Sequence, residues 1–552
     1  MVEWNENVPF FLFASAMRSL FLAAACFAVL GACVLLAAPD EDRPIPFRLV
    51  LVEPDGKSSP GIVRVLEADT SRPVPVPGLV DRLVGFKVPE AQRGWVVLPS
   101  GGAEIALPRG SYTIEALSGL ETDKTTQRLD LKGPVDGAVK VPLRVLFRPA
   151  ERGLVAGNTH LHLMKIGKKQ ADDYLRAVPA ADRLKVLFIS YLERKPDDKD
   201  YITNTYPLGP LTFPAPGGGG GAGRGIDATG VLYSNGEEHR HNFKAYGEGY
   251  GHVMFLNIKD LVKPVSIGPG IMLDGVDDAP LKGGVDEARR QKGTVIWCHN
   301  TLGYEAVLNA LAGRLDALNV FDGSRKGDYE QYYRYLNVGL KLPISTGTDW
   351  FIYDFSRVYA ALPAKEKLTV PTWLEALRRG RCQATNGPLL DLRVDGRTIG
   401  DTLKLDGPTR VKIEASGLGR VHFGKLQLIH NGKVIATKEV SATKAPFETR
   451  LEHEAFVEGP GWLALRVETT AQNELAQPLF AHTSPIYLEV KGRSLFQVDA
   501  ALALLKQIEE GAASIHAQGT FSSPTARDRL LALYEQGAAD LRERIRGRKG
   551  GS

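Results

Sequence analysis

The chain has 552 residues, of which 43% are hydrophobic and 24% are charged, and its formal net charge is +4. This length exceeds what a single hydrophobic core supports, so we expect several domains. The positive charge is small and spread along the chain, which argues against a nucleic-acid-binding protein.

An uncharged apolar segment, residues 20–38, follows Met17 and Arg18 near the N-terminus. Such a segment is typical of a secretory signal peptide or an uncleaved membrane anchor, and we assign residues 1–40 to it. The sequence "LGAC", ending at Cys33, also resembles a lipoprotein attachment motif. We therefore expect an exported protein of the periplasm, the cell envelope or the extracellular space, with membrane attachment through the N-terminus as the alternative to cleavage.

The pattern of apolar and polar residues changes several times after this segment. Residues 45–150 contain short apolar runs separated by turn residues, which predicts a β-sandwich. Residues 153–390 alternate apolar runs with helix-like stretches, which predicts a parallel, barrel-like α/β domain. Residues 391–490 predict a second β-sandwich, and residues 494–548 predict a helical hairpin. The glycine-rich stretch 214–225 lacks a phosphate-loop ending and is interpreted as a surface insertion.

The stretch "LVAGNTHLHL" ends an apolar run with His160 and His162. In an extended strand these two imidazoles leave the backbone on the same face, which suits one metal ion. The alternative is a polar strand end with two solvated histidines.

Further metal-ligating residue types follow other apolar runs: Glu237 and Glu238 after "GVLYSN", His299 at the end of "GTVIWCH", and Asp349 at the end of "LPISTGTD". In an α/β barrel the C-terminal ends of the strands share the catalytic face. Imidazoles with carboxylates suit zinc, manganese or iron, and a hydrolytic site of this type activates water. The spacing therefore predicts a metal site assembled from four strand ends.

Six stretches, in order along residues 153–400, resemble the signatures of the PHP (polymerase and histidinol phosphatase) superfamily, in its carbaryl-hydrolase-like CehA/McbA branch: "GNTHLHL", "NGEEHRH", "GYGHVMFLN", "IWCHN", "STGTDWF" and "LRRGRCQATNGPLLDLRVDG". The resemblance implies a distorted (β/α)7 barrel and metal-dependent hydrolysis of a phosphate, ester, amide or carbamate bond. It also implies the metal ligands His160, His162, Glu238, His252, His299 and Asp349.

The chain departs from the resembled pattern at the positions used for a third ion. Ser190, Tyr191 and Leu192 replace a Thr-Asp-His, and Phe351 replaces a further histidine. We therefore expect one or two divalent ions, with zinc favoured over manganese or iron, and Glu238 as the bridging ligand. We also expect a more apolar wall beside them, which would suit an organic ester or amide better than a highly charged phosphate.

Several residues keep two interpretations at this stage. Glu237 is the substitute ligand if Glu238 faces away, and Glu193 with Arg194 could supply new polar chemistry near the missing ligands. The histidines His239, His241, His252 and His299 could be ligands, or could be structural or solvated. Tyr353, Asp354 and Arg357 could contact substrate or serve packing. Cys298 is interpreted as a packing residue, and "TNGP" (385–388) as the closure of the barrel.

These features predict an exported metal-dependent hydrolase acting on a small-molecule or polymer substrate. The catalytic acid or base and the substrate-binding residues are not assigned. The alternatives are a non-catalytic cell-envelope protein that keeps a metal site for stability or ligand binding, and a sugar-polymer-binding module. With Cys26 and Cys33 in the N-terminal segment, Cys298 and Cys382 alone do not make a disulfide framework.

Overall fold

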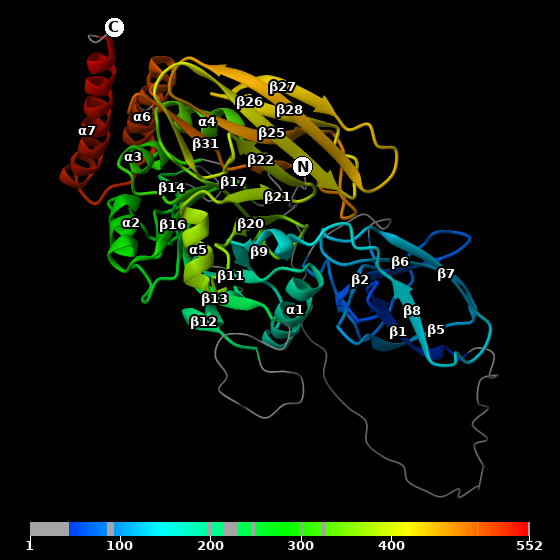
Figure 1. Ribbon diagram of the computed structural model, residues 1–552. Helices are drawn as coiled ribbons and strands as arrows, with labels where there is room; N and C mark the ends of the chain where they lie inside the picture. Colours follow the sequence, from blue (N-terminus) through cyan, green and yellow to red (C-terminus); the bar gives the residue numbers. More distant parts are fainter. Residues whose placement is uncertain are drawn as a thin grey trace, which may run out of the picture. The chain divides into compact units, whose positions relative to one another are not determined.

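The structure is a computed structural model, and it describes residues 43–85, 93–195, 201–213, 230–243, 249–299, 302–322, 327–493 and 495–549. The predicted signal or anchor (1–40) and the glycine-rich insertion (214–225) lie outside these residues. Among the described helices, none combines the length and the apolar character needed to cross a membrane. The architecture is a mixed α/β fold with large sheets, in agreement with the predicted fold class at this level (Figure 1).

Two sheets make up the N-terminal β region, which we define as residues 45–147. One sheet has the order β5-β1-β8, and the other has the order β3-β4-β2-β6-β7. Alternating sequences such as "TTQRLDL" in β7 bury one face and expose the other, and both sheets contribute to one hydrophobic core. The strands are β1 (Ile45–Val52), β2 (Gly61–Glu67), β3 (Val80–Asp81), β4 (Val96–Leu98), β5 (Ala103–Leu107), β6 (Gly110–Leu117), β7 (Thr125–Leu131) and β8 (Ala138–Pro142).

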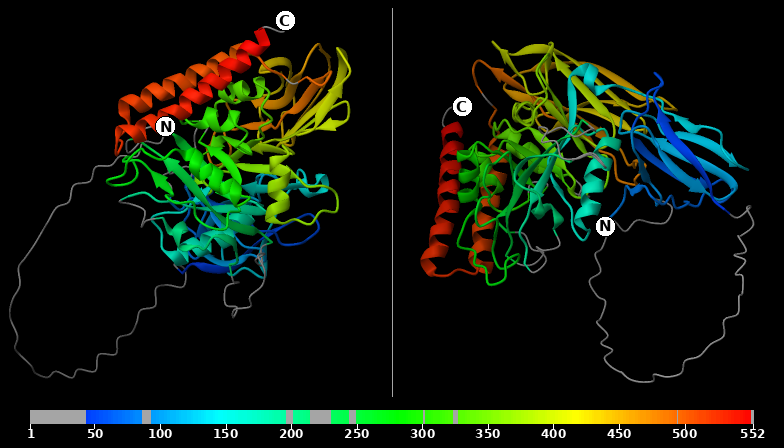
Figure 2. Two further views of the ribbon diagram at one scale, coloured as in Figure 1. Left: turned by 90° about the vertical axis from the view of Figure 1, so that its left-hand side faces the viewer. Right: turned by 90° about the horizontal axis from the view of Figure 1, so that it is seen from below.

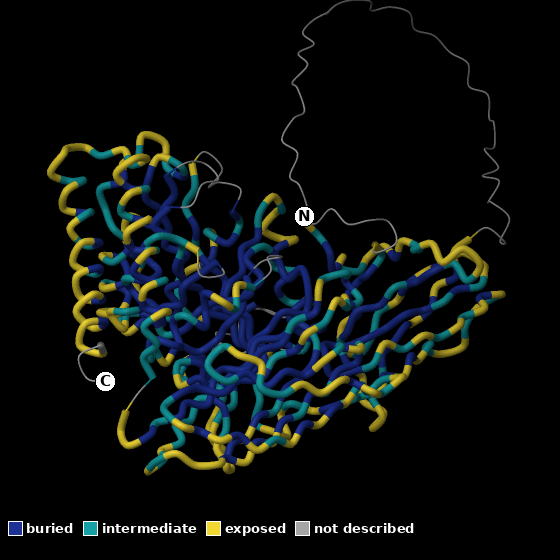
Figure 3. The backbone as a smooth tube through the Cα atoms, turned by 90° about the horizontal axis from the view of Figure 1, so that it is seen from above, coloured by how far each residue is buried: buried dark blue, intermediate teal, exposed yellow. Residues whose placement is uncertain are grey.

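The α/β region, residues 154–385, has strands that are almost entirely buried, as their continuous apolar sequences require (Figure 3). Its strands are β9 (Leu154–Asn158), β10 (Leu161–His162), β11 (Val186–Tyr191), β12 (Gly209–Leu211), β13 (Leu232–His241), β14 (Gly251–Leu256), β15 (Ser266–Ile267), β16 (Thr294–Cys298), β17 (Ala317–Asp322), β18 (Ile344–Gly347), β19 (Asp349–Trp350), β20 (Arg357–Ala361) and β21 (Cys382–Thr385). Its helices are α1 (Lys168–Ala181), α2 (Leu281–Arg290), α3 (Ala306–Leu311), α4 (Tyr329–Asn337) and α5 (Val370–Arg378).

The strand order of the α/β region combines parallel and antiparallel pairs. β9, β11 and β13 are parallel neighbours, and β16, β17 and β18 form a second parallel set. β14 runs antiparallel between β13 and β16, and β20 runs antiparallel to β9. β12 also runs antiparallel to β13, so the prediction of a parallel sheet is wrong at β12, β14 and β20. Only residues 242–250 connect β13 to β14, which is too short for the crossover that parallel neighbours need.

The C-terminal β region, residues 389–490, continues the paired strands of the α/β region through β21 and β30, and the connected set closes into a barrel. Its strands are β22 (Leu389–Val394), β23 (Arg397–Thr398), β24 (Thr402–Leu405), β25 (Thr409–Gly419), β26 (Lys425–His430), β27 (Lys433–Glu439), β28 (Phe447–Val457), β29 (Gly461–Glu468), β30 (Ala481–Thr483) and β31 (Ile486–Val490). A separate sheet has the order β23-β22-β25-β28, and strands of both sheets share one hydrophobic core.

The last two helices are α6 (Val498–Gln518) and α7 (Pro524–Lys549), and they lie side by side (Figure 2). They share a hydrophobic core with α2, α3 and α4 of the α/β region. The connection between them is attached to the same region, because the Thr520 backbone N–H donates to Asp277 at 2.6 Å.

Candidate metal centre

His160, His162 and Asp349 are brought together by the short parallel pairing of β10 with β19. The backbone N–H groups of Thr348 and Asp349 both donate to the His160 carbonyl at 3.0 Å, and the Phe351 N–H donates to the His162 carbonyl at 2.9 Å. Gly347 permits this approach, because a Cβ there would lie 2.3 Å from the His160 Cβ. Asp349 itself has a left-handed φ of 60°, a strained conformation for a residue other than glycine. The backbone therefore holds three of the predicted ligands in one register.

Successive side chains of strand β13 point to opposite faces of the sheet, so its charged residues form two sets. Glu238 and Arg240 face the histidines, whereas Glu237 contacts His239 at 3.2 Å and accepts from the Val262 N–H at 2.7 Å. His241 also lies away from the centre, with its Nε2 at 2.7 Å from Asp277 and its ring stacked on Tyr250. Glu238, and not Glu237, is therefore the candidate ligand.

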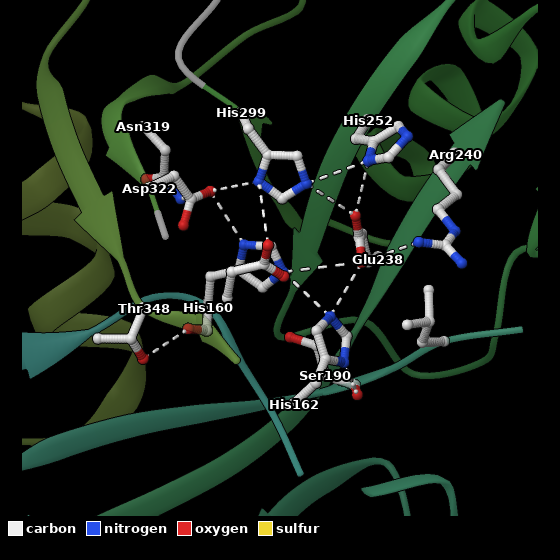
Figure 4. A network of polar contacts seen from close by, with 12 residues as sticks. His160, His162, Ser190, Glu238, Arg240, His252, His299, Asn319, Asp322 and Thr348 are labelled. Atoms are coloured by element: carbon white, nitrogen blue, oxygen red, sulfur yellow. Dashed lines mark hydrogen bonds and ion pairs between the residues drawn. The ribbon is translucent and has the colours of Figure 1, made fainter. Parts of the chain in front are cut away.

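A first group of ligand atoms contains His160 Nε2, His162 Nε2, Glu238 Oε2 and Asp349 Oδ1, all within 4.8 Å of one another. The two histidine Nε2 atoms lie only 3.0 Å apart, and His162 Nε2 lies 2.9 Å from Glu238 Oε2 (Figure 4). The side chains of both histidines are fully buried. The nitrogen and oxygen atoms of this group thus converge on one point, although Glu238 lies inside β13 and not at a strand end as the sequence predicted.

A second group contains Glu238 Oε1, His252 Nδ1 and His299 Nε2. His252 Nδ1 lies 2.9 Å from Glu238 Oε1 and 3.1 Å from His299 Nε2. Strand β14 brings His252 opposite Cys298, the residue before His299, through its antiparallel pairing with β16. Because the two carboxylate oxygens of Glu238 belong to different groups, this residue connects them. All six predicted ligands therefore lie in one of the two groups.

Asp322, at the end of β17, belongs to the centre although it is not among the predicted ligands. Its Oδ2 lies 3.0 Å from His160 Nδ1, 3.1 Å from His299 Nδ1 and 3.1 Å from Asn319 Nδ2. These are the histidine nitrogens that point away from the two groups above. Asp322 is thus placed to accept a hydrogen bond from each ring and to orient both imidazoles. The signal was present in the sequence, since "ALNVFD" is another apolar run that ends in a carboxylate.

The four histidines of the centre share one arrangement: each has one ring nitrogen next to a protein oxygen and the other turned toward a ligand group. His160 and His299 use Asp322, His162 Nδ1 lies 2.9 Å from the Ser190 carbonyl oxygen, and His252 Nε2 lies 3.0 Å from Asn242 Oδ1. A carbonyl oxygen can only accept, so the His162 proton resides on Nδ1 and its Nε2 presents a lone pair. Metal-binding histidines are typically oriented in this way.

The protonation tendencies of the centre also fit a cation site. Glu238 Oε1 and Asp349 Oδ1 are buried and form no well-directed hydrogen bond, although imidazole nitrogens lie close by. Burial acts to raise the pKa of Glu238, but Arg240 and the histidines hold it well below its usual value. Burial lowers the pKa of His252 to about 4, so its ring is neutral and can donate a lone pair. The donor set therefore fits one or two divalent ions.

Neighbouring carboxylates favour the protonated form of two histidines of the centre. Burial opposes the charge on His299, but Asp349, Asp322 and Glu238 raise its pKa to about 9. Asp322 and Asp349 likewise raise the pKa of His160 against burial. A cation at the centre would replace these protons as the partner of the carboxylates.

The remaining candidate residues have structural partners. Asp354 accepts from Ser356 and Asn386, and Arg357 donates to the backbone carbonyls of Phe355 and Asp182, which supports the packing interpretation. Asn386 of "TNGP" also donates to the Pro478 carbonyl and thereby joins the C-terminal β region. The solvated-loop alternative for His239 and His241 is wrong, because both residues are buried in β13.

The residues at the expected third-ion positions supply no ligand to the described groups. Glu193 forms an ion pair with Lys263 at 2.6 Å, and Leu192 is fully buried. Phe351 does not form a wall beside the ligands, because it packs against Tyr174 and Gly85 on the side of the N-terminal β region. Its left-handed φ of 45° turns it there.

The rings of Trp350 and Tyr201 lie beside His162, and Tyr201 is buried. Their rings stack with centroids 5.7 Å apart, and the Trp350 ring lies 5.3 Å from the His162 ring. Trp350 is half-buried, so part of the indole remains accessible. The apolar wall was expected from Leu192 and Phe351; the aromatic rings closest to His162 belong instead to Trp350 and Tyr201.

Cys298 and Cys382 are both free and buried. The Cys298 sulfur lies among His160, His299 and Asp322, and burial raises the pKa of its thiol above the usual range. A protonated thiol is a poor metal ligand, which agrees with the interpretation of Cys298 as a packing residue.

A scan of the chain against protein-family models and a search of curated proteins both find no match.

Proposed function

We propose that the chain is a metal-dependent hydrolase of the PHP type, with a distorted (β/α)7 barrel flanked by two β-sandwiches and a C-terminal helical hairpin. The observation that carries the proposal is the common arrangement of the four histidines, each with one ring nitrogen next to a protein oxygen and the other turned toward Glu238 or Asp349. A set of histidines and carboxylates without thiolate favours zinc, with manganese or iron as alternatives.

The two ligand groups would hold one or two divalent ions through His160, His162, Glu238, His252, His299 and Asp349. When bound, such ions polarise a carbonyl or phosphoryl oxygen and make water more acidic. The chain contributes the orientation: Asp322 holds the rings of His160 and His299, and Glu238 connects the two groups. Trp350 and Tyr201 would bind an apolar part of the substrate, which favours an organic ester or amide, either as a small molecule or in a polymer.

Elemental analysis and substrate screening test this proposal together. The full chain, loaded with zinc or manganese, is assayed against para-nitrophenyl acetate, a para-nitroanilide and para-nitrophenyl phosphate. We expect one or two ions per chain and hydrolysis that is lost in His162→Ala. His516→Ala, at an exposed histidine of α6, is the matched control and should retain both properties. A metal-free protein, or equal activity in wild type and His162→Ala, would contradict the proposal.

A structural role for the metal is the second candidate function, and the burial of the ligands favours it. His160, His162 and Glu238 are buried as deeply as core residues, so an ion there would also hold several strand ends together. This candidate predicts a large loss of thermal stability on metal removal, with no hydrolysis of any of the three substrate classes by the loaded protein.

Export to the cell envelope is part of the proposal and rests on residues 20–38 alone. Cell fractionation of the full chain tests it. Recovery with the membrane, the periplasm or the medium is expected, whereas recovery from the cytosol would contradict export.

A further inference from the structure

Arg240 lies on the same face of β13 as Glu238 and two residues closer to the C-terminal end of the strand. Its Nη1 lies 3.9 Å from Glu238 Oε2, so the guanidinium adjoins the carboxylate that connects the two ligand groups (Figure 4). The residue is only 5% exposed. A positive charge is therefore buried beside the candidate metal centre, on the ligand-bearing face of the strand.

The partners of this guanidinium are few. Among the residues that the structure describes, its only side-chain contact with a carboxylate is the 3.9 Å approach to Glu238. Its Nη2 reaches the Glu193 carbonyl at 3.5 Å, the limit of a hydrogen bond. Nε is buried and has no hydrogen-bond partner among the described residues. The guanidinium thus retains unused hydrogen-bonding capacity next to the centre.

Arg82 and Arg420, two other buried arginines of the structure, are satisfied differently, whereas Arg357 bonds mainly to backbone carbonyls. Arg82 makes two hydrogen bonds to Asp182, and Arg420 makes two to Glu474 at 2.7 and 2.8 Å. Such two-bond pairs offset the desolvation of a buried guanidinium, which is otherwise unfavourable for any buried ion. Arg240 lacks a pair of this kind, although it is buried to a similar degree.

Occupation of the ligand groups would weaken the one carboxylate contact that Arg240 has. Glu238 already faces His160, His162, His252 and His299, and a cation held by its two oxygens would compete with Arg240 for its charge. A divalent ion in each group would also outweigh the three carboxylates Glu238, Asp322 and Asp349. Arg240 would then add a further positive charge in a buried place, which an anion would compensate.

We propose that Arg240 binds an anionic oxygen group of the substrate, a carboxylate or a phosphate, beside the metal centre. The planar guanidinium presents paired N–H donors that match two oxygens of such a group. The substrate would thus combine an apolar part, bound at Trp350 and Tyr201, with one negative charge near the bond that is cleaved. The proposal rests on the proposed function for the identity of the bound molecule as a substrate.

Calorimetric titration of the full chain with two probe anions, inorganic phosphate and benzoate, tests the role of Arg240. Both the metal-loaded and the metal-stripped protein are titrated, and metal content is measured in parallel. In the metal-loaded protein we expect at least one anion to bind, and Arg240→Met to weaken that binding about tenfold or more. The anion affinity of Arg240→Lys should lie between those of wild type and Arg240→Met, because lysine keeps the charge without the paired donors.

Lys263→Met is the matched control, since it removes one positive charge that pairs with Glu193 and does not contact the ligand groups. It should change anion affinity by less than about twofold, as expected for a screened surface charge. If Arg240→Met fails to fold, the anion affinities of wild type, Arg240→Lys and Lys263→Met test the role of Arg240 instead. The relative affinity for benzoate and phosphate shows whether the site prefers a carboxylate or a phosphate group.

The results of these titrations distinguish failure of this inference from failure of the proposed function. Equal anion affinity in wild type and the Arg240 variants, or no binding of either anion to wild type, would overturn the inference even if the loaded protein hydrolyses esters. Conversely, Arg240-dependent anion binding in a protein that lacks metal or hydrolytic activity would support the anion site and contradict the hydrolase.

Discussion

The carboxylate of Asp322 lies 3.1 Å from Nδ1 of His299, and the same oxygen lies 3.0 Å from Nδ1 of His160. One oxygen therefore orients two imidazoles that come from different strands. Each of these imidazoles directs its Nε2 to a different ligand group. This makes Asp322 the residue whose removal should affect both groups without removing a ligand.

Asp322→Asn should lower metal affinity by about 10- to 100-fold, because partners of this kind fix the ring orientation of metal-binding histidines. Competition with a chromophoric chelator measures the affinity. Asp391→Asn, at a half-exposed carboxylate of β22, is the control and should leave the affinity unchanged. Unchanged affinity in Asp322→Asn would show that the rings are held by packing alone.

Glu238→Gln and Glu237→Gln are adjacent substitutions with opposite expected effects. Glu238→Gln should abolish most metal binding, since a neutral amide cannot replace the carboxylate that connects the two groups. Glu237→Gln should retain the metal but lower the free energy of unfolding by about 1–3 kcal/mol, through its buried contacts with His239 and Val262. Elemental analysis and denaturant unfolding measure the two effects, and the reverse pattern would reassign the ligand.

His252→Ala should reduce the number of bound ions without abolishing binding. The first group keeps His160, His162, Glu238 and Asp349, whereas the second loses one of its three members. If the wild type binds two ions, we expect the variant to bind one, as determined by elemental analysis after dialysis. Loss of all metal would mean that the groups cannot be occupied separately.

Arg82→Met tests the connection between the N-terminal β region and the centre. Arg82 is fully buried, pairs with Asp182 at 2.6 Å, and donates to the backbone carbonyls of Ile352 and Asp354, just after the ligand Asp349. Breaking a buried pair typically costs about 3–5 kcal/mol. We expect a large fall in Tm together with weaker metal binding. Arg48→Met removes the exposed pair with Glu104 and should cost no more than about 1 kcal/mol.

Glu305 should make stability depend on pH. Burial raises its pKa to about 7, against the opposing effect of the Leu281 and Lys282 N–H groups that donate to it. The folded state therefore binds a proton that the unfolded state has lost, and stability falls as pH rises from about 4.5 to about 7. A shift of this size corresponds to about 3 kcal/mol at most. Urea unfolding across this range should show a flatter pH profile for Glu305→Gln, and an identical profile would exclude this residue as the cause.

Most of the candidate ligands could be selected from the sequence, partly through strand periodicity and strand ends and partly, as with His252, through the family resemblance alone. The one-residue spacing of His160 and His162 placed both on one face, and the alternation in β13 separated Glu238 from Glu237. Asp322 was missed although its position satisfies the same strand-end rule. It lies in a stretch outside the resembled motifs, and its partners are histidines distant in sequence.

Features that depend on backbone conformation were not predictable in this way. The left-handed φ of Asp349 and Phe351 turns the Phe351 side chain away from the ligands, and only the three-dimensional path shows it. The antiparallel direction of β14 likewise follows from the path between two strands, which apolar periodicity does not record. The pairing of Arg82 with Asp182 joins residues in different regions and has no local sequence signal.

Glu238 belongs to both ligand groups, and Asp322 contacts one histidine of each, so the two groups are coupled during metal loading. An ion in the first group would immobilise His160 and Glu238, and Asp322 would transmit this constraint to the ring of His299. The second group would then already be ordered when its own ion arrives, so less conformational entropy would be lost in that step. Since mutual repulsion of the two ions acts in the opposite direction, the shape of a binding isotherm reports which of these two couplings dominates.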